Sequence, residues 1–267
     1  MAAPSPPAPP PPGTIIGLRI PPKQQDEQHH STVIQMPNDE CAWAQGYPNI
    51  QKGCFLGRVC QYAHPKQCQY YEIESLLQVG PTCGLVALSM MFNGEPTPAE
   101  LLADAKKNKY TLNGEMFSAQ YLYELTRRNL DRRTGSCQLH EGALDCDKIK
   151  KLLRAGGCLL VPYDADTNHA PCLKSGHRAH WALVVGFLVD ENDEFYVFAR
   201  HGKTRNIAVW SLATLSQSNA NLTQFAQPKG YPDCTFHQPE GGLAGPLGLM
   251  NRCILINGLP QQIVHVC

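Results

Sequence analysis

One cysteine and one histidine in this chain of 267 residues stand where covalent hydrolysis would need them. Cys83 follows a Gly-Pro-Thr turn and begins an apolar run that predicts a helix, and Gln78 lies shortly before it. His180 directly precedes the apolar run Trp181–Val189, which predicts a buried strand. The pattern indicates a thiol nucleophile, an imidazole acid–base group and an amide that donates to an oxyanion.

A helix start at Cys83 favours the thiolate form of its side chain. The first helical turn leaves backbone N–H groups unpaired and carries a partial positive charge. A cysteine pKa of about 8.5 falls to roughly 3.5–7.5 at such sites. We therefore expect a lowered pKa for Cys83, a helix cap from Thr82 and free space for a substrate beside Gly84. Losing an oxyanion donor such as Gln78 would cost about 3 kcal/mol of barrier.

Each of these residues also has an ordinary structural interpretation. Cysteine is among the most buried residue types, so Cys83 in an apolar run fits simple core packing. A histidine before a buried strand is often a hydrogen-bonded core group. The ordered set of Gln78, Cys83 and His180 favours catalysis, because His180 falls at a strand end, where sites lie.

The elements that must hold these residues are predicted from apolar periodicity and from helix caps. Thr97-Pro98-Ala99-Glu100 forms a capping box that opens a helix extending to Lys107. Further elements are expected as helices at 118–128 and 145–155, and as strands at 158–163, 180–189, 195–199, 207–210 and 253–256. Helices followed by antiparallel strands predict an α+β fold, in which the helical half carries Cys83 and the sheet carries His180.

Composition narrows the range of functions. The formal net charge is zero, which argues against a nucleic-acid or membrane partner. No apolar run approaches the roughly 20 residues of a membrane span, and the N-terminus lacks the features of a signal peptide. The twelve cysteines are therefore expected to be reduced thiols in the cytoplasm. Residues 1–40 predict a disordered proline-rich tail and linker, and residues 41–267 predict one domain.

A competing interpretation concerns Cys41, Cys54, Cys60 and His64, with Cys68 close behind. Their order resembles a zinc finger of the Cys-Cys-Cys-His type, a family that binds single-stranded RNA, and tetrahedral zinc needs four such ligands. The gap from Cys41 to Cys54 is long and basic partners are few, so we expect no metal here. The alternative is a non-catalytic scaffold with a zinc-binding or RNA-binding lead-in.

Six longer strings carry a more specific signal: Gln78–Leu88, Asn113–Ser118, Leu160–His169, Pro171-Cys172, Gly176–Trp181 and Gly202-Lys203. Together they resemble the actin maturation protease family over residues 70–257. The resemblance implies a papain-like fold and a cytoplasmic cysteine aminopeptidase, without a cofactor, that removes the N-acetylated first residue, Met or Cys, from immature actin. Carried over by position, Cys83 is the nucleophile and His180 the acid–base group.

The group that orients His180 is open at this point. Papain-like enzymes usually place Asn or Asp on the strand after the histidine, where this chain has His201. Asp164, Asp166 and Asn168 are alternatives if their loop folds over the site.

Two charged or proline-rich segments suggest how a protein substrate is held. Basic side chains flank His180 and would either meet an acidic substrate or form an ordinary solvated face; they are Lys174, His177, Arg178, Lys203 and Arg205. The run Pro9-Pro10-Pro11-Pro12 is preordered in polyproline II form. We expect it to dock on profilin that carries immature actin.

Overall fold

The computed structural model describes residues 39–130, 135–259 and 261–267, so the expected tail and most of its linker lie outside the described residues. In these ranges the helices are α1 (Pro48–Gly57), α2 (Cys83–Met91), α3 (Pro98–Lys107), α4 (Ala119–Leu130), α5 (Asp147–Arg154) and α6 (Leu212–Ala220), with 3-10 turns at Ala42–Ala44 and Gly242–Ala244. The strands are β1 (Gln67–Tyr71), β2 (Ser136–Glu141), β3 (Cys158–Asp164), β4 (Ala179–Val189), β5 (Phe195–Arg200), β6 (Ala208–Ser211), β7 (Arg252–Asn257) and β8 (Ile263–His265).

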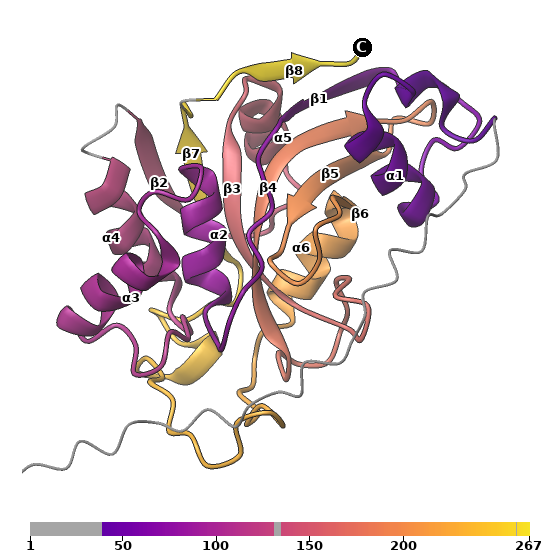
Figure 1. Cartoon of the computed structure of the whole chain (residues 1–267). Coiled ribbons are helices and arrows are strands. Elements are labelled where there is room, and N and C mark those ends of the chain that lie inside the picture. The colour runs from indigo at the N-terminus through magenta and orange to yellow at the C-terminus, as the bar shows by residue number, and fades with distance from the viewer. Residues whose placement is uncertain (1–38, 131–134, 260) are drawn as a thin grey trace, which may run out of the picture. The chain divides into compact units, whose positions relative to one another are not determined.

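The strands form one antiparallel sheet that is centred on the long strand β4 (Figure 1). The order is β2-β7-β3-β4-β1-β8, and β5 pairs with β4 and with β6. Along β4, β5 occupies one edge, whereas β3 and then β1 occupy the other. β4 is buried almost from end to end, so its apolar run reflects contacts on both faces of the sheet.

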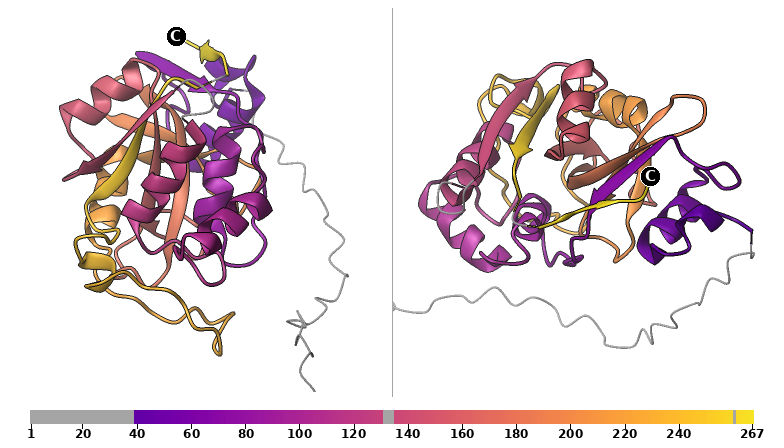
Figure 2. Two further views of the ribbon diagram at one scale, coloured as in Figure 1. Left: turned by 90° about the vertical axis from the view of Figure 1, so that its left-hand side faces the viewer. Right: turned by 90° about the horizontal axis from the view of Figure 1, so that it is seen from above.

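Helices cover both faces of the sheet (Figures 1 and 2). The apolar residues of α2, α3 and α4 join one core cluster, and those of α5 and α6 join a second cluster across the sheet. Trp181, Leu183 and Val185 face the α2 side. A β-bulge between Val184 and Gly186 then changes the alternation of β4.

The α+β class and the elements around the site agree with the sequence prediction. The capping box is present, because Thr97 accepts from the backbone N–H of Glu100 while the Glu100 carboxylate accepts from that of Thr97. The expected order of helices first and strands second is wrong, since β1 and β2 precede most of the sheet. Helices α1 and α6 and strands β1, β2 and β8 were also not predicted.

All twelve cysteines fall within the described residues and none forms a disulfide. None of the described helices combines the length and apolar character needed to cross a bilayer.

Candidate active site

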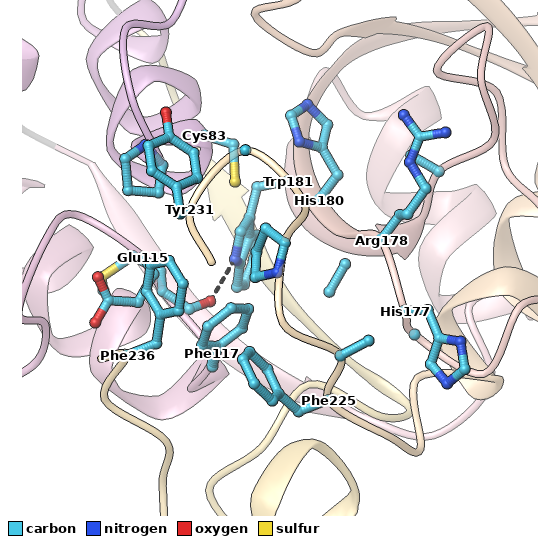
Figure 3. Close-up of a pocket in the computed structure, with 18 of the residues that line it drawn as sticks. Cys83, Glu115, Phe117, His177, Arg178, His180, Trp181, Phe225, Tyr231 and Phe236 are labelled. Atoms are coloured by element: carbon cyan, nitrogen blue, oxygen red, sulfur yellow. Dashed lines mark hydrogen bonds between the residues drawn. The ribbon is translucent and has the colours of Figure 1, made fainter. Parts of the chain in front are cut away.

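Gln78, Cys83 and His180 line one cavity of about 840 Å³, although they come from a loop, a helix and a strand. Figure 3 shows Cys83 and His180 together on one side of this cavity, above a group of aromatic rings. The packing of α2 against β4 brings the two residues together. The three residues predicted from the sequence therefore share one solvent-accessible site.

Cys83 is the first residue of α2 and is half-buried. Thr82 does not cap the helix with its side chain; its hydroxyl donates to the carbonyl of Val79 at 2.8 Å. The space beside Gly84 is also taken. A Cβ added there would lie 3.0 Å from the Cβ of Met116 and 3.2 Å from the Cδ1 of Trp181. Gly84 therefore admits these two side chains, and the expectation that it leaves room for a substrate is wrong.

The pKa of Cys83 is raised from its ordinary value, contrary to the expectation from the helix start. Burial is the main cause, because the thiolate loses hydration. The backbone N–H of Trp181, the charge of Lys203 and the N–H groups of Gly84 and Cys83 lower the pKa, but less than burial raises it. The resting side chain is thus a neutral thiol.

His180 is only 6% exposed and its tautomer is set by one hydrogen bond. Its Nε2 lies 2.7 Å from the backbone carbonyl oxygen of His201. Because a carbonyl oxygen only accepts, Nε2 carries the proton and Nδ1 keeps a lone pair that can take up a proton. The ring of Tyr163 packs edge-on against the imidazole, with centroids 5.7 Å apart.

Burial lowers the pKa of His180 to about 3, and the nearby Lys203, His201 and His169 act in the same direction. The bond to the His201 carbonyl opposes this shift but does not cancel it. The imidazole is therefore neutral near pH 7. Cys83 and His180 rest as a neutral thiol and a neutral imidazole, not as an ion pair.

The candidates for an orienting side chain behave differently from the expectation. The His201 ring does not bond His180; its Nδ1 accepts from the backbone N–H of Lys203 at 3.3 Å, and its plane stacks on Trp210. Only the main chain of His201 contacts the imidazole through a hydrogen bond. Every residue has a backbone carbonyl, so its role cannot be recognised from residue types. The sequence could therefore indicate position 201, but not that its carbonyl oxygen makes the contact.

The acidic and amide alternatives organise neighbouring loops. The buried carboxylate of Asp164 accepts from the backbone N–H groups of Lys174 at 2.6 Å, Gly176 at 2.9 Å and Arg178 at 3.2 Å. Asp166 accepts from Asn168 and Ala170 within its own turn. Asp164 thus holds the loop that leads into His180, and the carboxylates of Asp164 and Asp166 accept from backbone N–H groups and not from His180.

Gln78 is held at both its main chain and its side chain. Its backbone N–H donates to the carbonyl of Gly202 at 2.8 Å, and its side-chain Nε2 donates to the carbonyl of Gly80 at 2.8 Å. Its Oε1 is buried without a hydrogen-bond partner among the described residues. A primary amide carries two N–H bonds, so the bond to Gly80 uses one of them.

An aromatic group forms the side of the cavity opposite Cys83 and His180 (Figure 3). Phe117 lies at the centre, with ring centroids 5.2 Å from Phe225 and 6.1 Å from Phe236. Tyr231 meets Phe236 edge-on. The sequence analysis did not identify these residues, because they come together only through the long loop after α6.

The buried carboxylate of Glu115 ties this loop to the body of the fold. It accepts from the backbone N–H groups of Leu112, Asn113 and His237 at 3.0, 2.7 and 2.8 Å. Trp181 holds the segment next to Glu115, because its indole N–H donates to the carbonyl of Met116 at 2.7 Å. The aromatic side is therefore built on fixed main chain.

Basic side chains line the cavity, and Figure 3 places Arg178 and His177 on the side of His180. Four of the five basic residues predicted from the sequence belong to the lining, namely Lys174, His177, Arg178 and Lys203, whereas Arg205 does not. Lys229 was not predicted and also lines the cavity. The Glu115 carboxylate is buried and is directed at three backbone N–H groups. The charge that the lining presents to a substrate is therefore positive.

The cysteines near the start of the domain are core residues. Cys41, Cys54 and Cys68 are fully or almost fully buried, and burial raises the pKa of each. His64 bonds to the backbone carbonyl of Pro65. Across residues 39–130, 135–259 and 261–267, no group of three or more His, Cys, Asp or Glu side chains is placed to hold a metal ion.

Comparison with known proteins gives consistent matches. Residues 73–188 match the family model described as actin maturation protease-like, C-terminal domain, a range that contains Cys83 and His180. The chain is 68% identical over 228 residues to the actin maturation protease of Drosophila melanogaster, which covers 85% of each chain. It is 30% identical to the protein of the same name from Danio rerio, over 71% of this chain and 74% of that one. The human protein of that name is 28% identical, over 73% of this chain and 66% of that one.

Proposed function

The chain belongs to the actin maturation protease family, and on that basis we propose that it is a cysteine aminopeptidase acting on the N-terminus of immature actin. The bond cleaved joins the N-acetylated first residue, Met or Cys, to the second residue. The reaction takes place in the cytoplasm, needs no cofactor and uses a papain-like arrangement of a helix that carries Cys83 and a strand that carries His180.

The first half of the proposed reaction forms an acyl-enzyme. His180 Nδ1 takes the thiol proton as Cys83 Sγ adds to the carbonyl carbon of the first residue. The second amide N–H of Gln78 and a backbone N–H near Cys83 stabilise the oxyanion. The C–N bond then breaks, and the proton on Nδ1 passes to the leaving amine of the shortened actin.

The second half releases the first residue. Water gives a proton to His180 Nδ1 and adds to the thioester carbonyl, the C–S bond breaks, and the Cys83 sulfur recovers its proton. Throughout, Nε2 keeps its proton, which stays hydrogen-bonded to the His201 carbonyl. Nδ1 therefore performs every proton transfer. Because thiol and imidazole are neutral at rest, proton transfer accompanies the attack.

The cavity supports this choice of substrate. Its aromatic side offers an apolar surface for the side chain of the first residue, across the cavity from Cys83. Its cationic side, with Lys174 and Arg178, suits the acidic residues that follow the first residue of actin. A cavity of about 840 Å³ has room for more than one residue, so both contacts can form together.

The observation that carries the proposal is the bond from His180 Nε2 to the His201 carbonyl, in the cavity that also holds Cys83. It leaves Nδ1 as the one ring nitrogen of this buried imidazole that can take up and release a proton during the reaction. An acid–base group needs such a nitrogen, whereas a core histidine does not.

The proposal is tested by mass spectrometry of actin N-termini in cells that lack this protein. We expect actin that retains its acetylated first residue, and rescue by the wild-type chain but not by Cys83→Ala. Fully processed actin in the deficient cells would contradict the proposed substrate.

A further inference from the structure

Two neighbouring backbone carbonyls in the turn after β5 each hold a group of the proposed mechanism. The carbonyl oxygen of His201 accepts from His180 Nε2 at 2.7 Å. The next carbonyl, that of Gly202, accepts from the backbone N–H of Gln78 at 2.8 Å. The acid–base group and the residue assigned to the oxyanion are therefore fixed by consecutive residues of one turn.

The turn is closed by contacts of its own, from Arg200 to Arg205. The buried guanidinium of Arg200 donates through NH1 to the carbonyl of Arg205 at 2.7 Å. Inside the turn, the backbone N–H of Lys203 donates to Nδ1 of the His201 ring. From outside, the hydroxyl of Ser75 donates to the carbonyl of Thr204 at 2.9 Å. The turn is thus tied at its ends, at its middle and to the segment before Gln78.

Gly202 gives the turn its shape. Its φ of +69° lies in the left-handed region that glycine adopts without strain. A Cβ at this position would lie 3.1 Å from Val86 Cγ1 and 3.5 Å from the carbonyl oxygen of Leu76. Only glycine combines this backbone conformation with so close an approach to α2 and to the Gln78 segment.

We infer that the turn Arg200–Arg205 positions both His180 and Gln78, with its main chain in the place of a third catalytic side chain. Gly202 and Arg200 are its positioning residues. The inference rests on the proposed function, since it concerns the same site. Whether or not a substrate is bound, the turn also fixes the tautomer of His180.

The test compares Gly202→Ala with Gly258→Ala in the full chain. Gly258 has a similar φ of +75° but no atom within 4 Å of an added Cβ, and it lies outside the cavity. Both variants carry backbone strain, but only Gly202→Ala disturbs the carbonyls of His201 and Gly202 that hold His180 and Gln78. Ring-nitrogen NMR of histidine-labelled protein, with the His180 signal assigned through His180→Gln, reports the tautomer. Kinetics on a short peptide with the acetylated actin N-terminus report kcat and KM separately.

We expect His180 to be the Nε2–H tautomer in the wild type and in Gly258→Ala, and a tautomer mixture in Gly202→Ala. The kcat of Gly202→Ala should fall by about 100-fold, as small misplacements of reacting groups do, while KM stays within about threefold. An unchanged tautomer and kcat in Gly202→Ala, or equal losses in Gly258→Ala, would overturn the inference.

Two variants of Arg200 provide an independent test that still applies if Gly202→Ala does not fold. Arg200→Met removes the donor that closes the turn, whereas Arg200→Lys keeps a donor. We expect kcat to fall in Arg200→Met and to recover in part in Arg200→Lys, with a matching recovery of the tautomer; no difference between the two would count against the inference. If the wild type shows the expected tautomer but cleaves no actin peptide, the proposed function fails while the positioning of His180 stands.

Discussion

At the residue scale, burial decides the charge states of Cys83 and His180. Burial raises the pKa of the thiol and lowers that of the imidazole to about 3, so each group is neutral near pH 7. A thiolate–imidazolium pair would need both shifts to have the opposite sign. The helix start and Lys203 favour the thiolate, but burial raises the pKa of the thiol more than they lower it.

The neutral thiol predicts how the free protein reacts with an alkylating agent. Because only the thiolate is nucleophilic, the rate of Cys83 alkylation should rise continuously from pH 6 to pH 9. The Cys146→Ala variant, which lacks a half-buried thiol outside the cavity, should give the same profile. Alkylation followed at Cys83 by peptide mapping checks this. A fast rate that is constant below pH 7 would instead indicate a resting ion pair.

The three histidines of the cavity lining should differ sharply in importance. We expect His180→Ala to lower kcat by about 10³-fold, within the range for the loss of a general acid–base group. His169→Ala and His177→Ala should each cost less than about tenfold, because neither residue lies on β4, the strand that packs against the helix of Cys83. The assay compares the three rates at matched protein concentration. Equal losses in all three variants would mean that His180 is the wrong assignment.

The sequence was sufficient to group Cys83, His180 and Gln78 as one candidate site, and the structure places all three in one cavity. It was not sufficient to find what orients His180. The orienting group is a carbonyl that every residue possesses, and its position follows from the turn at Gly202. The sign of the Cys83 pKa shift was also out of reach, since it depends on how deeply the folded chain buries the thiol.

At the element scale, β4 pairs with β1 so closely that no side chain fits where the two strands meet. Gly186 makes this possible. A Cβ there would lie 2.3 Å from the carbonyl oxygen of Gln69 and 2.5 Å from the Cα of Tyr70. Both atoms belong to main chain, so they cannot move aside as the end of a flexible side chain would.

Gly186→Ala should therefore lower the free energy of unfolding by about 3 kcal/mol, the upper range for forced overpacking. Gly46→Ala is the matched control, because nothing lies within 4 Å of an added Cβ there, and its effect should stay within about 0.5 kcal/mol. Denaturant unfolding of both variants measures the difference. Equal stability of the two would show that β1 is not held against β4 as described.

Local signals explain which elements the sequence predicted. Helix α3 was identified from its capping box, a pattern confined to four residues, and β3 to β5 from long apolar runs. Strand β1 has no long apolar run; the alternation of Gln67 and Gln69 with Cys68 and Tyr70 is a short strand signal that the sequence analysis did not use. Its pairing with β4 and β8 is a long-range property that no window of its own sequence contains.

At the scale of the whole molecule, the cavity is assembled from segments that are far apart in the chain. Cys83 comes from α2, His180 from β4 and Phe236 from the loop after α6. The sequence identified the candidate residues at one side of this cavity, but not the aromatic side. That side depends on Glu115, whose three hydrogen bonds to backbone N–H groups join two loops.

The proline-rich segment 1–12 lies outside the described residues, and its role stays a prediction from the sequence. If it docks on profilin, it raises the local concentration of profilin-bound actin at Cys83 through the linker that follows. Deleting residues 1–12 should then leave cleavage of a short acetylated actin peptide unchanged and slow the processing of profilin-bound actin. Rates measured on both substrates decide this. Equal rates for the full-length and truncated chains on profilin-bound actin would mean that the segment is a spacer.

The most direct test of the central claim is the intact mass of purified, N-acetylated actin after incubation with the purified chain. The account predicts that the wild type removes the mass of the acetylated first residue, and that Cys83→Ala removes nothing while it unfolds within about 1 kcal/mol of the wild type. Cys146→Ala, the control for a lost half-buried thiol, should retain wild-type activity. Cleavage by Cys83→Ala at the wild-type rate would contradict the account.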